Sequence, residues 1–213
     1  MKKRLDEICV SKGFFDSREK AKRFIMAGEV FVNGNCVIDA SKKFDEDNIR
    51  IQIKVKDLYV SRGGLKLKKA IDYFGINLNG KICLDIGVAT GGFSDCMLKE
   101  GARKVYGVDV GKGQVHQKLL SESRFHFIPN TNARFLKKDI FEDDIEFVAV
   151  DVSFISLKLI IPSLLNCLSK KTDIVLLLKP QFELKPKDLK KGVVKSDELR
   201  YKALNDIIDF IKN

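Results

Sequence analysis

Residues 81–93 read Lys-Ile-Cys-Leu-Asp-Ile-Gly-Val-Ala-Thr-Gly-Gly-Phe, and this stretch decides the fold of the chain. Its apolar run predicts a buried parallel strand over 82–86, with Asp85 near the carboxyl end of that strand. Open α/β sheets bind their ligands at this end of the strands. The glycines that follow allow the backbone to turn tightly and to approach a bound molecule that a Cβ atom would exclude. These glycines are Gly87, Gly91 and Gly92.

The acidic residues around this turn indicate which ligand it binds. The pattern Asp-x-Gly-x-x-x-Gly-Gly differs from the Gly-x-Gly-x-x-Gly of dinucleotide sites. Asp109 ends a second predicted strand, 104–108, and its carboxylate can accept hydrogen bonds from both ribose hydroxyls of an adenosine. Asp85 would repel a pyrophosphate but can pair with an ammonium group. These features favour S-adenosylmethionine over NAD, and an ordinary glycine-rich turn is the alternative.

The basic charge of the chain is unevenly distributed. Its 213 residues include 39 Lys and Arg against 29 Asp and Glu, a net charge of +10. Residues 1–69 hold 17 of the basic and 10 of the acidic side chains, so +7 of the excess lies in the first third. Such a segment favours a polyanionic partner, of which nucleic acid is the commonest. A lysine-rich surface that only confers solubility is the alternative.

Cysteine usage and hydropathy argue against several classes of protein. The five cysteines form no Cys-x-x-Cys pair, which predicts buried thiols in a reducing compartment and no disulfide or zinc framework. The basic start Met-Lys-Lys-Arg is not followed by the apolar stretch of a signal peptide. No run of about eighteen apolar residues predicts a membrane span. We therefore expect a cytoplasmic protein.

Residues 1–53 predict a small α+β domain. The apolar periodicity indicates helices over 4–12 and 18–27, and Ser17 is a suitable N-cap for the second helix. The pair Asn33-Gly34 between two apolar runs predicts a β-hairpin, and residues 49–53 predict a further strand. Two helices, one of them basic, followed by a small sheet can present cations to a phosphate backbone.

This segment resembles the alpha-L RNA-binding module, first named from a ribosomal small-subunit protein. The resemblance rests on Arg4-Leu-Asp, on Ser17-Arg18 with Ala21, and on the run from Ile25 to Gly34. It implies that the module binds RNA by contacts to phosphates, which would be made by Arg4, Arg18, Lys22 and Arg23. Surface charges that make no useful contact are the alternative for some of them.

A linker and a glycine-opened helix follow this domain. Residues 54–58 predict the linker, and residues 59–213 the second domain. The pair Gly63-Gly64 opens a predicted helix whose free amides, with Arg62 beside them, can hold a phosphate. The lysines of this helix, which include Lys66, cannot all be buried. We expect one of them to point into the site.

Strands and helices alternate from Ile82 onward, which predicts a mainly parallel sheet with helices on both faces. The expected strands are 82–86, 104–108, 125–128, 146–151 and 173–179, and the expected helices are 92–100, 113–120, 156–168 and 197–212. Asp151 and Lys179 end two apolar strands at the ligand edge. A charge there is costly unless it is paired, so we expect the two to be partners. A purely structural salt bridge is the alternative.

The second domain resembles the FtsJ-type ribose methyltransferases, and the whole chain is similar to the TlyA family, whose members are named both hemolysins and ribosomal RNA ribose methyltransferases. The matching stretches are Tyr59–Leu67, Leu84–Phe93, Gly107–Gln114, Asn130–Arg134, Asp151–Leu157 and Leu178–Glu183. The resemblance implies an α/β, Rossmann-like sheet that binds S-adenosylmethionine, with ribosomal RNA or ribosomal subunits as partner. Its catalytic residues would be Lys66, Asp151 and Lys179. Its cofactor-binding residues would be Asp85, Gly87, Thr90, Gly91, Gly92, Phe93, Asp109 and Asn132, and Arg62 would add an RNA contact.

The chemistry of methyl transfer to a ribose suits these side chains. The 2′-hydroxyl has to be oriented and has to lose its proton as it attacks the methyl group of a sulfonium. A lysine can accept that proton or orient the oxygen, and Asp151 would hold both lysines in place. The positive charge of the sulfonium disappears in the transition state, so we expect that no metal is needed and that much of the acceleration comes from positioning.

One part of the family pattern has no counterpart in this chain. A glutamate in a Gly-Asn-x-Glu context near the family's C-terminus is absent, and we expect the last two strands of the usual seven-stranded sheet to be absent with it, leaving an exposed sheet edge. The first alternative function is therefore a catalytically impaired RNA-binding protein. A membrane-lytic protein is a second alternative, and a nucleotide-dependent oxidoreductase is the least favoured. The sequence does not indicate an oligomeric state.

Overall fold

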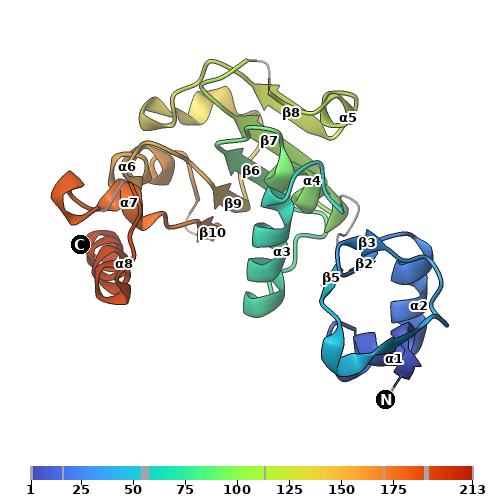
Figure 1. The fold of residues 1–213 in the computed structure, drawn as a ribbon. Coiled ribbons are helices and arrows are strands. Elements are labelled where there is room, and N and C mark those ends of the chain that lie inside the picture. Colours follow the sequence, from blue (N-terminus) through green and yellow to red (C-terminus); the bar gives the residue numbers. More distant parts are fainter. Residues whose placement is uncertain are drawn as a thin grey trace. The chain divides into compact units, whose positions relative to one another are not determined.

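The computed structural model describes residues 2–15, 17–53, 58–112, 114–169, 171–189 and 192–212. The chain divides into two compact units, the N-terminal unit Met1–Leu58 and the C-terminal unit Tyr59–Asn213 (Figure 1). Residues 54–57, which belong to the expected linker, lie outside the described residues. Each unit is described by itself.

The N-terminal unit combines two helices with short antiparallel strands. Its elements are β1 (Lys2–Arg4), α1 (Leu5–Ser11), α2 (Arg18–Met26), β2 (Val30–Val32), β3 (Asn35–Cys36), β4 (Lys43–Asp45), a 3-10 helix (Glu46–Asn48) and β5 (Ile51–Ile53). One sheet has the order β3-β2-β5, and β1 pairs with β4. The β1–β4 pair was not expected, because neither three-residue segment shows an alternating apolar pattern.

Local sequence explains the ends of α2 and the hairpin. The Ser17 hydroxyl accepts a hydrogen bond from the Lys20 amide, which confirms it as the N-cap. Asn33 and Gly34 have φ values of 50° and 84°, the left-handed pair that joins two strands through a two-residue turn. The second hairpin strand is shorter than expected and ends at Cys36.

The core of this unit lies between the helices and the three-stranded sheet. Leu5, Ile8 and Ile25 from the two helices are fully buried together with Val30 of β2. The helices therefore rest on the sheet, as expected for a unit too small to build a large core.

The C-terminal unit contains a five-stranded parallel sheet with the order β10-β9-β6-β7-β8. Its strands are β6 (Ile82–Ile86), β7 (Lys104–Val108), β8 (Phe125–Ile128), β9 (Phe147–Val150) and β10 (Asp173–Leu176). Its α-helices are α3 (Gly63–Phe74), α4 (Gly92–Lys99), α5 (Gln117–Leu120), α6 (Ile161–Leu165), α7 (Pro180–Glu183) and α8 (Asp197–Lys212), and its 3-10 helices are Ala133–Phe135, Lys138–Ile140, Leu157–Leu159 and Pro186–Asp188. In this order β7 and β8 lie on one side of β6, whereas the later strands β9 and β10 lie on its other side, so the strand order changes direction between β6 and β9. This is the switch point at which such sheets bind ligands.

Successive strand residues face opposite sides of the sheet and so build two cores. Cys83, Val105 and Phe147 pack on one side with α3, α4 and α5. Leu84 and Val148 pack on the other side with α6 and α8. The helices therefore cover both faces, which confirms the predicted three-layer arrangement (Figure 1).

Two expected helices are shorter or broken. The helix expected over 113–120 is reduced to α5, and Gly113 lies outside the described residues. The helix expected over 156–168 is a 3-10 helix, Leu157–Leu159, followed by α6. Pro162 explains the break, because it has no amide hydrogen to donate and is favoured only in a first helical turn.

The first residues of the C-terminal unit are fixed against α4. Tyr59 is only 4% exposed, and a Cβ atom on Gly64 would lie 2.3 Å from its ring. The Val60 amide donates a hydrogen bond to the buried Asp95 carboxylate over 2.8 Å. The stretch before α3 is therefore an integral part of this unit.

Candidate functional site

A cavity of about 460 Å³ lies at the carboxyl ends of β6, β7 and β9. Ile86 and Gly87 from β6, Val108 and Asp109 from β7, and Asp151 after β9 line it. It therefore occupies the switch point of the sheet. Apolar side chains with a few polar groups make up the wall, as is typical of sites for small organic molecules.

Asp109 is held in a fixed orientation at the wall of this cavity. One carboxylate oxygen accepts a hydrogen bond from the Ala89 amide and the other from the Gly111 amide, both over 2.8 Å. Each oxygen keeps a further lone pair, which a ribose hydroxyl can use. Asn132 lies on the same cavity, and its side-chain oxygen is occupied by the Arg134 amide.

The glycine turn after β6 leaves no space for side chains. Gly87 has a φ of 89°, and a Cβ atom there would lie 2.6 Å from the Asp151 carbonyl oxygen. A Cβ atom on Gly91 would lie 2.1 Å from the Leu119 side chain. Both positions therefore require glycine, and the turn forms an open cradle of backbone.

Asp85 lies beneath this turn and lines neither cavity at the site. It is fully buried, and one carboxylate oxygen accepts hydrogen bonds from the Ser94 amide (2.9 Å) and hydroxyl (2.6 Å). Its Oδ1 atom has no hydrogen-bond partner among the described residues. Burial raises the pKa of this carboxyl to about 7, although the hydrogen bonds from Ser94 act in the opposite direction.

A second, smaller cavity of about 150 Å³ adjoins the first. Gly87, Ala89, Asp151 and Ser153 line both cavities. The predicted residues Thr90, Gly92, Phe93 and Lys179 line the smaller one. Gly91, which is part of the same turn, lines neither cavity and packs against Leu119. Two adjoining spaces of unequal size suit a cofactor and the group that reacts with it.

The three predicted catalytic residues meet at Asp151, which lines both cavities, whereas Lys179 lines the smaller one and Lys66 lines neither. The Asp151 carboxylate lies 3.3 Å from Lys66 Nζ and 2.5 Å from Lys179 Nζ. Lys179 Nζ also donates a hydrogen bond to the Ser153 hydroxyl over 2.7 Å. The expected partnership of Asp151 and Lys179 is therefore confirmed, and Lys66 is the lysine of α3 that reaches the site. The next lysine, Lys68, is bound instead to Asp72 and Glu100.

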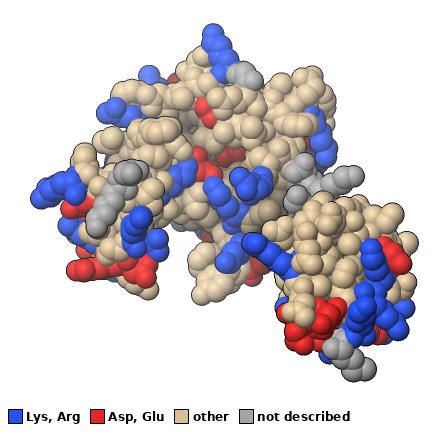
Figure 2. Space-filling view, viewed as in Figure 1, with Lys and Arg blue, Asp and Glu red and all other residues tan. Residues whose placement is uncertain are grey.

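The arginines expected to bind RNA are partly engaged within the N-terminal unit. Arg4 and Arg18 both form ion pairs with Asp6, whose side chain is fully buried. Lys22 pairs with Glu19 over 3.1 Å, and Arg23 is exposed. The face of this unit shown in Figure 2 accordingly carries basic and acidic side chains next to one another.

Arg62 is exposed and belongs to the C-terminal unit. It directly precedes α3, which begins at the predicted glycine pair. The Ser61 hydroxyl accepts a hydrogen bond from the Gly63 amide, and Ser61 lines the smaller cavity. Arg62 therefore lies next in sequence to a residue of the site.

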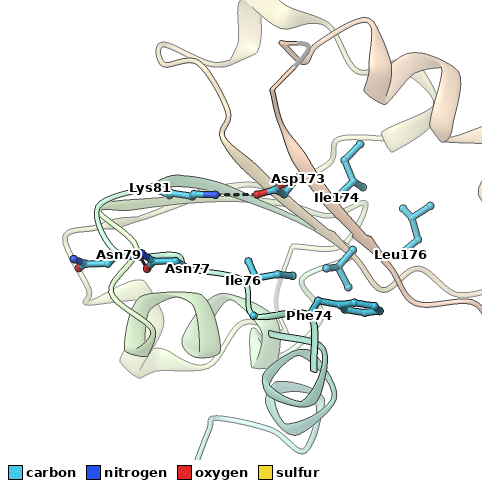
Figure 3. A pocket seen from close by; sticks show the side chains of 10 residues that line it. Phe74, Ile76, Asn77, Asn79, Lys81, Asp173, Ile174 and Leu176 are labelled. Carbon is cyan, nitrogen blue, oxygen red and sulfur yellow. Dashed lines mark hydrogen bonds and ion pairs between the residues drawn. The ribbon is translucent and has the colours of Figure 1, made fainter. Parts of the chain in front are cut away.

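A larger cavity, of about 680 Å³, lies away from this chemistry. Figure 3 shows Phe74, Ile76 and Leu176 around it, with Lys81 and Asp173 joined by an ion pair of 3.0 Å. The residues of β10, a strand at one edge of the sheet, form one side of this cavity. Because no predicted site residue lines it, we place the functional site at the two cavities of the switch point.

Three residues near the site were missed in the sequence. Ser153 and Ser156 stand within the stretch that follows β9, and Glu183 ends α7. The signal for Ser153 was its position two residues after Asp151, in a loop at the ligand edge. Serine and glutamate are common on protein surfaces, so nothing in their identity marked them.

The fold and the site define a Rossmann-type unit with a cavity at the switch point of its sheet, joined to a small α+β unit. The model of FtsJ-like methyltransferases matches residues 59–213, and that of the S4 domain matches residues 3–49. Hemolysin A of Brachyspira hyodysenteriae is 47% identical over 211 residues, which cover 98% of this chain and 87% of the relative. The 16S/23S rRNA (cytidine-2′-O)-methyltransferase TlyA of Mycobacterium tuberculosis is 37% identical over 94% of this chain and 76% of the relative.

A solved structure supports the same assignment. A Streptococcus thermophilus protein named as a hemolysin superposes with a TM-score of 0.72 at 39% identity, covering 98% of this chain and 77% of that one. The chain therefore belongs to the family of FtsJ-like methyltransferases that carry an S4 domain. Across the part of the chain that the structure describes, no helix is both long and apolar enough to cross a membrane.

Proposed function

We propose that this chain transfers a methyl group from S-adenosylmethionine to a ribose 2′-hydroxyl of ribosomal RNA, in the cytoplasm. The observation that carries the proposal is that Asp151, which lines both cavities, forms ion pairs with Lys66 and Lys179. The name of the mycobacterial relative, an rRNA (cytidine-2′-O)-methyltransferase, supports the same reaction.

The larger cavity fits the adenosine part of the cofactor. The Asp109 carboxylate would accept hydrogen bonds from the ribose hydroxyls, and Asn132 would face the same space. The backbone of the turn at Gly87 and Gly92, which lines the smaller cavity, would hold the amino-acid part beside Thr90 and Phe93. The buried, unpartnered Oδ1 of Asp85 lies beneath this cradle and would attract the ammonium group. S-adenosylmethionine supplies an electrophilic methyl group when it is bound.

Asp151 and the two lysines that pair with it would handle the acceptor hydroxyl. Lys179 Nζ forms an ion pair with Asp151 over 2.5 Å and donates a hydrogen bond to the Ser153 hydroxyl. In its neutral form the Lys179 amine would turn its lone pair to the 2′-hydroxyl and accept the proton that this group loses as it attacks the methyl carbon. Asp151 would hold Lys179 and Lys66 at fixed positions, and this positioning would supply much of the rate.

The N-terminal unit would dock the RNA. Arg4, Arg18, Lys22 and Arg23 would contact phosphates, and Arg62 would add a contact beside the site. Phosphate contacts position a protein on nucleic acid without reading its sequence. The 2′-hydroxyl is itself the acceptor, so the reaction distinguishes RNA from DNA.

The test is transfer of labelled methyl groups from S-adenosylmethionine to ribosomal subunits that lack the modification, followed by mapping of the product. We expect the label on a ribose, and we expect the RNA chain to resist alkaline cleavage at that nucleotide. Lys66→Ala should lower transfer by about 10–100-fold, because it removes one of the cations held by Asp151. Lys69→Ala, on the exposed side of the same helix, is the matched control and should transfer at the unmutated rate. Label on a base, or no transfer to any ribosomal RNA, would contradict the proposal.

A further inference from the structure

One carboxylate joins the two loops that carry the site. Glu183 ends α7, the short helix that begins directly after Lys179. Its Oε1 atom accepts a hydrogen bond from the Leu157 amide over 2.9 Å, and its Oε2 atom accepts one from the Ser156 hydroxyl over 2.5 Å. Both partners lie in the loop after β9, the loop that carries Asp151 and Ser153.

The donor and the acceptor of each of these hydrogen bonds can be assigned. An ionised carboxylate has no hydrogen to donate, so the Ser156 hydroxyl must donate to Glu183. The same hydroxyl accepts a hydrogen bond from the Lys158 amide over 3.2 Å and so caps the 3-10 helix Leu157–Leu159. Glu183 thus takes up one free amide and one hydroxyl at the start of that helix.

The loop between these contacts needs such an attachment. Phe154 has a φ of 64°, which is unfavourable for a bulky residue, and its side chain is 92% exposed. Its principal neighbour is Phe182, whose ring centroid lies 5.2 Å away and which directly precedes Glu183. Val152 and Ile155 on either side of Phe154 are partly buried against the core, whereas Phe154 itself contributes little burial. The two ends of the loop are also fixed by polar contacts, at Lys179 and at Glu183.

We propose that Glu183 is a positioning residue for methyl transfer, which holds the loop after β9 so that Asp151 and Ser153 orient the Lys179 amine. The proposal rests on the proposed function for the meaning of that orientation, but the contact itself does not depend on it. Glu183 acts through the loop and does not line either cavity of the site.

The first measurement is single-turnover methyl transfer by the full chain and three variants. Glu183→Ala should lower the rate of transfer by about 10–100-fold at saturating cofactor, since small misplacements of reacting groups carry penalties of this size. Glu183→Gln should stay within about threefold, because the amide oxygen can accept from Leu157 and the amide nitrogen can donate to Ser156. The dissociation constant of S-adenosylmethionine should be unchanged in both variants.

The matched control is Glu146→Ala. The Glu146 carboxylate also accepts a hydrogen bond from a backbone amide, that of Ile82 over 2.9 Å, but at the amino end of the sheet. This variant loses a comparable contact far from the site. It should lower the melting temperature about as much as Glu183→Ala and leave the rate of transfer unchanged.

The second measurement does not require activity. The rate at which an amine-reactive ester labels Lys179, read by peptide mass spectrometry, reports how firmly Asp151 and Ser153 hold the amine. We expect Glu183→Ala to raise that rate at least about threefold and Glu146→Ala to leave it unchanged. Ser156→Ala combined with Glu183→Ala should raise it no further, because the two residues act through one contact.

The outcomes separate the two proposals. If the unmutated chain transfers no methyl group, the proposed function fails, while Lys179 labelling still decides whether Glu183 holds the amine. If Glu183→Ala labels Lys179 at the unmutated rate, the inference is overturned. It is also overturned if Glu183→Gln loses as much transfer as Glu183→Ala, since the contact would then depend on charge and not on hydrogen bonding.

Discussion

Each unit of this protein contains an aspartate that is shared by two cations, but the two arrangements differ in burial and in chemistry. In the N-terminal unit Asp6 is fully buried and binds the guanidinium groups of Arg4 and Arg18. In the C-terminal unit the Asp151 side chain is 16% exposed, at the wall of two cavities, and binds the ammonium groups of Lys66 and Lys179. The same electrostatic arrangement therefore occurs in two different settings.

The difference concerns whether the cation can release a proton. A guanidinium keeps its charge at any physiological pH and offers several donors in one plane, which suits the presentation of fixed charge to phosphates. An amine can exchange a proton and can be aimed as a single donor or acceptor. The arginine pair thus suits docking, and the lysine pair suits a reaction in which a hydroxyl loses its proton.

Substitutions of Lys179 test whether this difference between a guanidinium and an amine matters for the reaction. Lys179→Arg keeps a cation beside Asp151 but removes the amine, and Lys179→Ala removes both. We expect both variants to lower single-turnover methyl transfer by about 1,000-fold, the middle of the range for a lost general base. The affinity for S-adenosylmethionine, measured by calorimetry, should change little. Lys187→Arg, on an exposed 3-10 helix, is the control, and near-normal activity of Lys179→Arg would show that charge alone suffices.

A third aspartate sharpens the comparison, because it is buried without a cation. Asp85 has a pKa raised to about 7 by burial, well above the value near 3.8 of a free side chain. Between these values the folded state binds more protons than the unfolded state, so stability falls as pH rises from about 4 to about 7. Asp85→Asn should remove this dependence and stabilise the protein at pH 8 by on the order of 3 kcal/mol. Urea unfolding at pH 5 and pH 8 measures both effects.

The control for this measurement is Asp144→Asn. The Asp144 side chain is 75% exposed and pairs with Lys138 at the surface. Exposed pairs contribute little to stability, so this variant should keep the unmutated dependence on pH. If Asp85→Asn also kept that dependence, the assignment of the titration to Asp85 would be wrong.

Asp6 shows the opposite behaviour. Burial raises the pKa of this carboxyl, but the hydrogen bonds and charges of Arg4 and Arg18 outweigh it, so the pKa lies below its usual value of 3.8. The ionised carboxylate therefore contributes stability above about pH 4, and that contribution is lost as pH falls through the lowered pKa. Asp6→Asn should destabilise the N-terminal unit by about 1–3 kcal/mol at pH 7.

Hydrogen exchange read by mass spectrometry checks this prediction, because it resolves α1 and α2 from the rest of the chain. The loss should appear as faster exchange in both helices, and not in the parallel sheet. Asp39→Asn provides the control, since that side chain is exposed and its main hydrogen bonds come from Ser41. If α1 were equally protected from hydrogen exchange in Asp6→Asn and in the unmutated chain, Asp6 would not have the structural role assigned to it.

The smallest effects are expected for the exposed cations of α2. Lys22 already shares its charge with Glu19, whereas Arg23 lies exposed next to it. Arg23→Ala should weaken RNA binding about threefold and reduce the salt slope by about one, as for the loss of one phosphate contact. Lys22→Ala should have less effect. Equal salt slopes for both variants and the unmutated chain would exclude α2 from the RNA interface.

The sequence predicted the elements that carry the site better than the contacts between loops. Strand ends were predictable, because apolar runs closed by Asp85, Asp109, Asp151 and Lys179 place their charges at one edge of a parallel sheet. The expected contact of Asp151 with Lys179 follows from that topology. The register of short loops does not follow from periodicity, and so the contact of Glu183 with Ser156 was not foreseen.

The burial of carboxylates was also not predictable from the sequence. Asp6 resembles an ordinary acid in the first turn of a helix, and nothing in the local sequence indicates that it is fully buried between two arginines. Asp85 lies below the turn with Ser94 and lines neither cavity, a depth that the sequence did not indicate, and its contact with the cofactor stays a prediction. Sequence pattern identifies which strand end carries a charge, whereas its depth depends on packing by distant residues.

The packing of Tyr59 determines where the chain can be divided. Its ring lies against Gly64 at a separation that excludes any Cβ atom, and the next amide is bound to Asp95. A C-terminal fragment that begins at Gly64 would expose the core under α3 and leave the Asp95 carboxylate without that donor. Gene fusions, protease sites and separately expressed halves should therefore divide the protein before Tyr59.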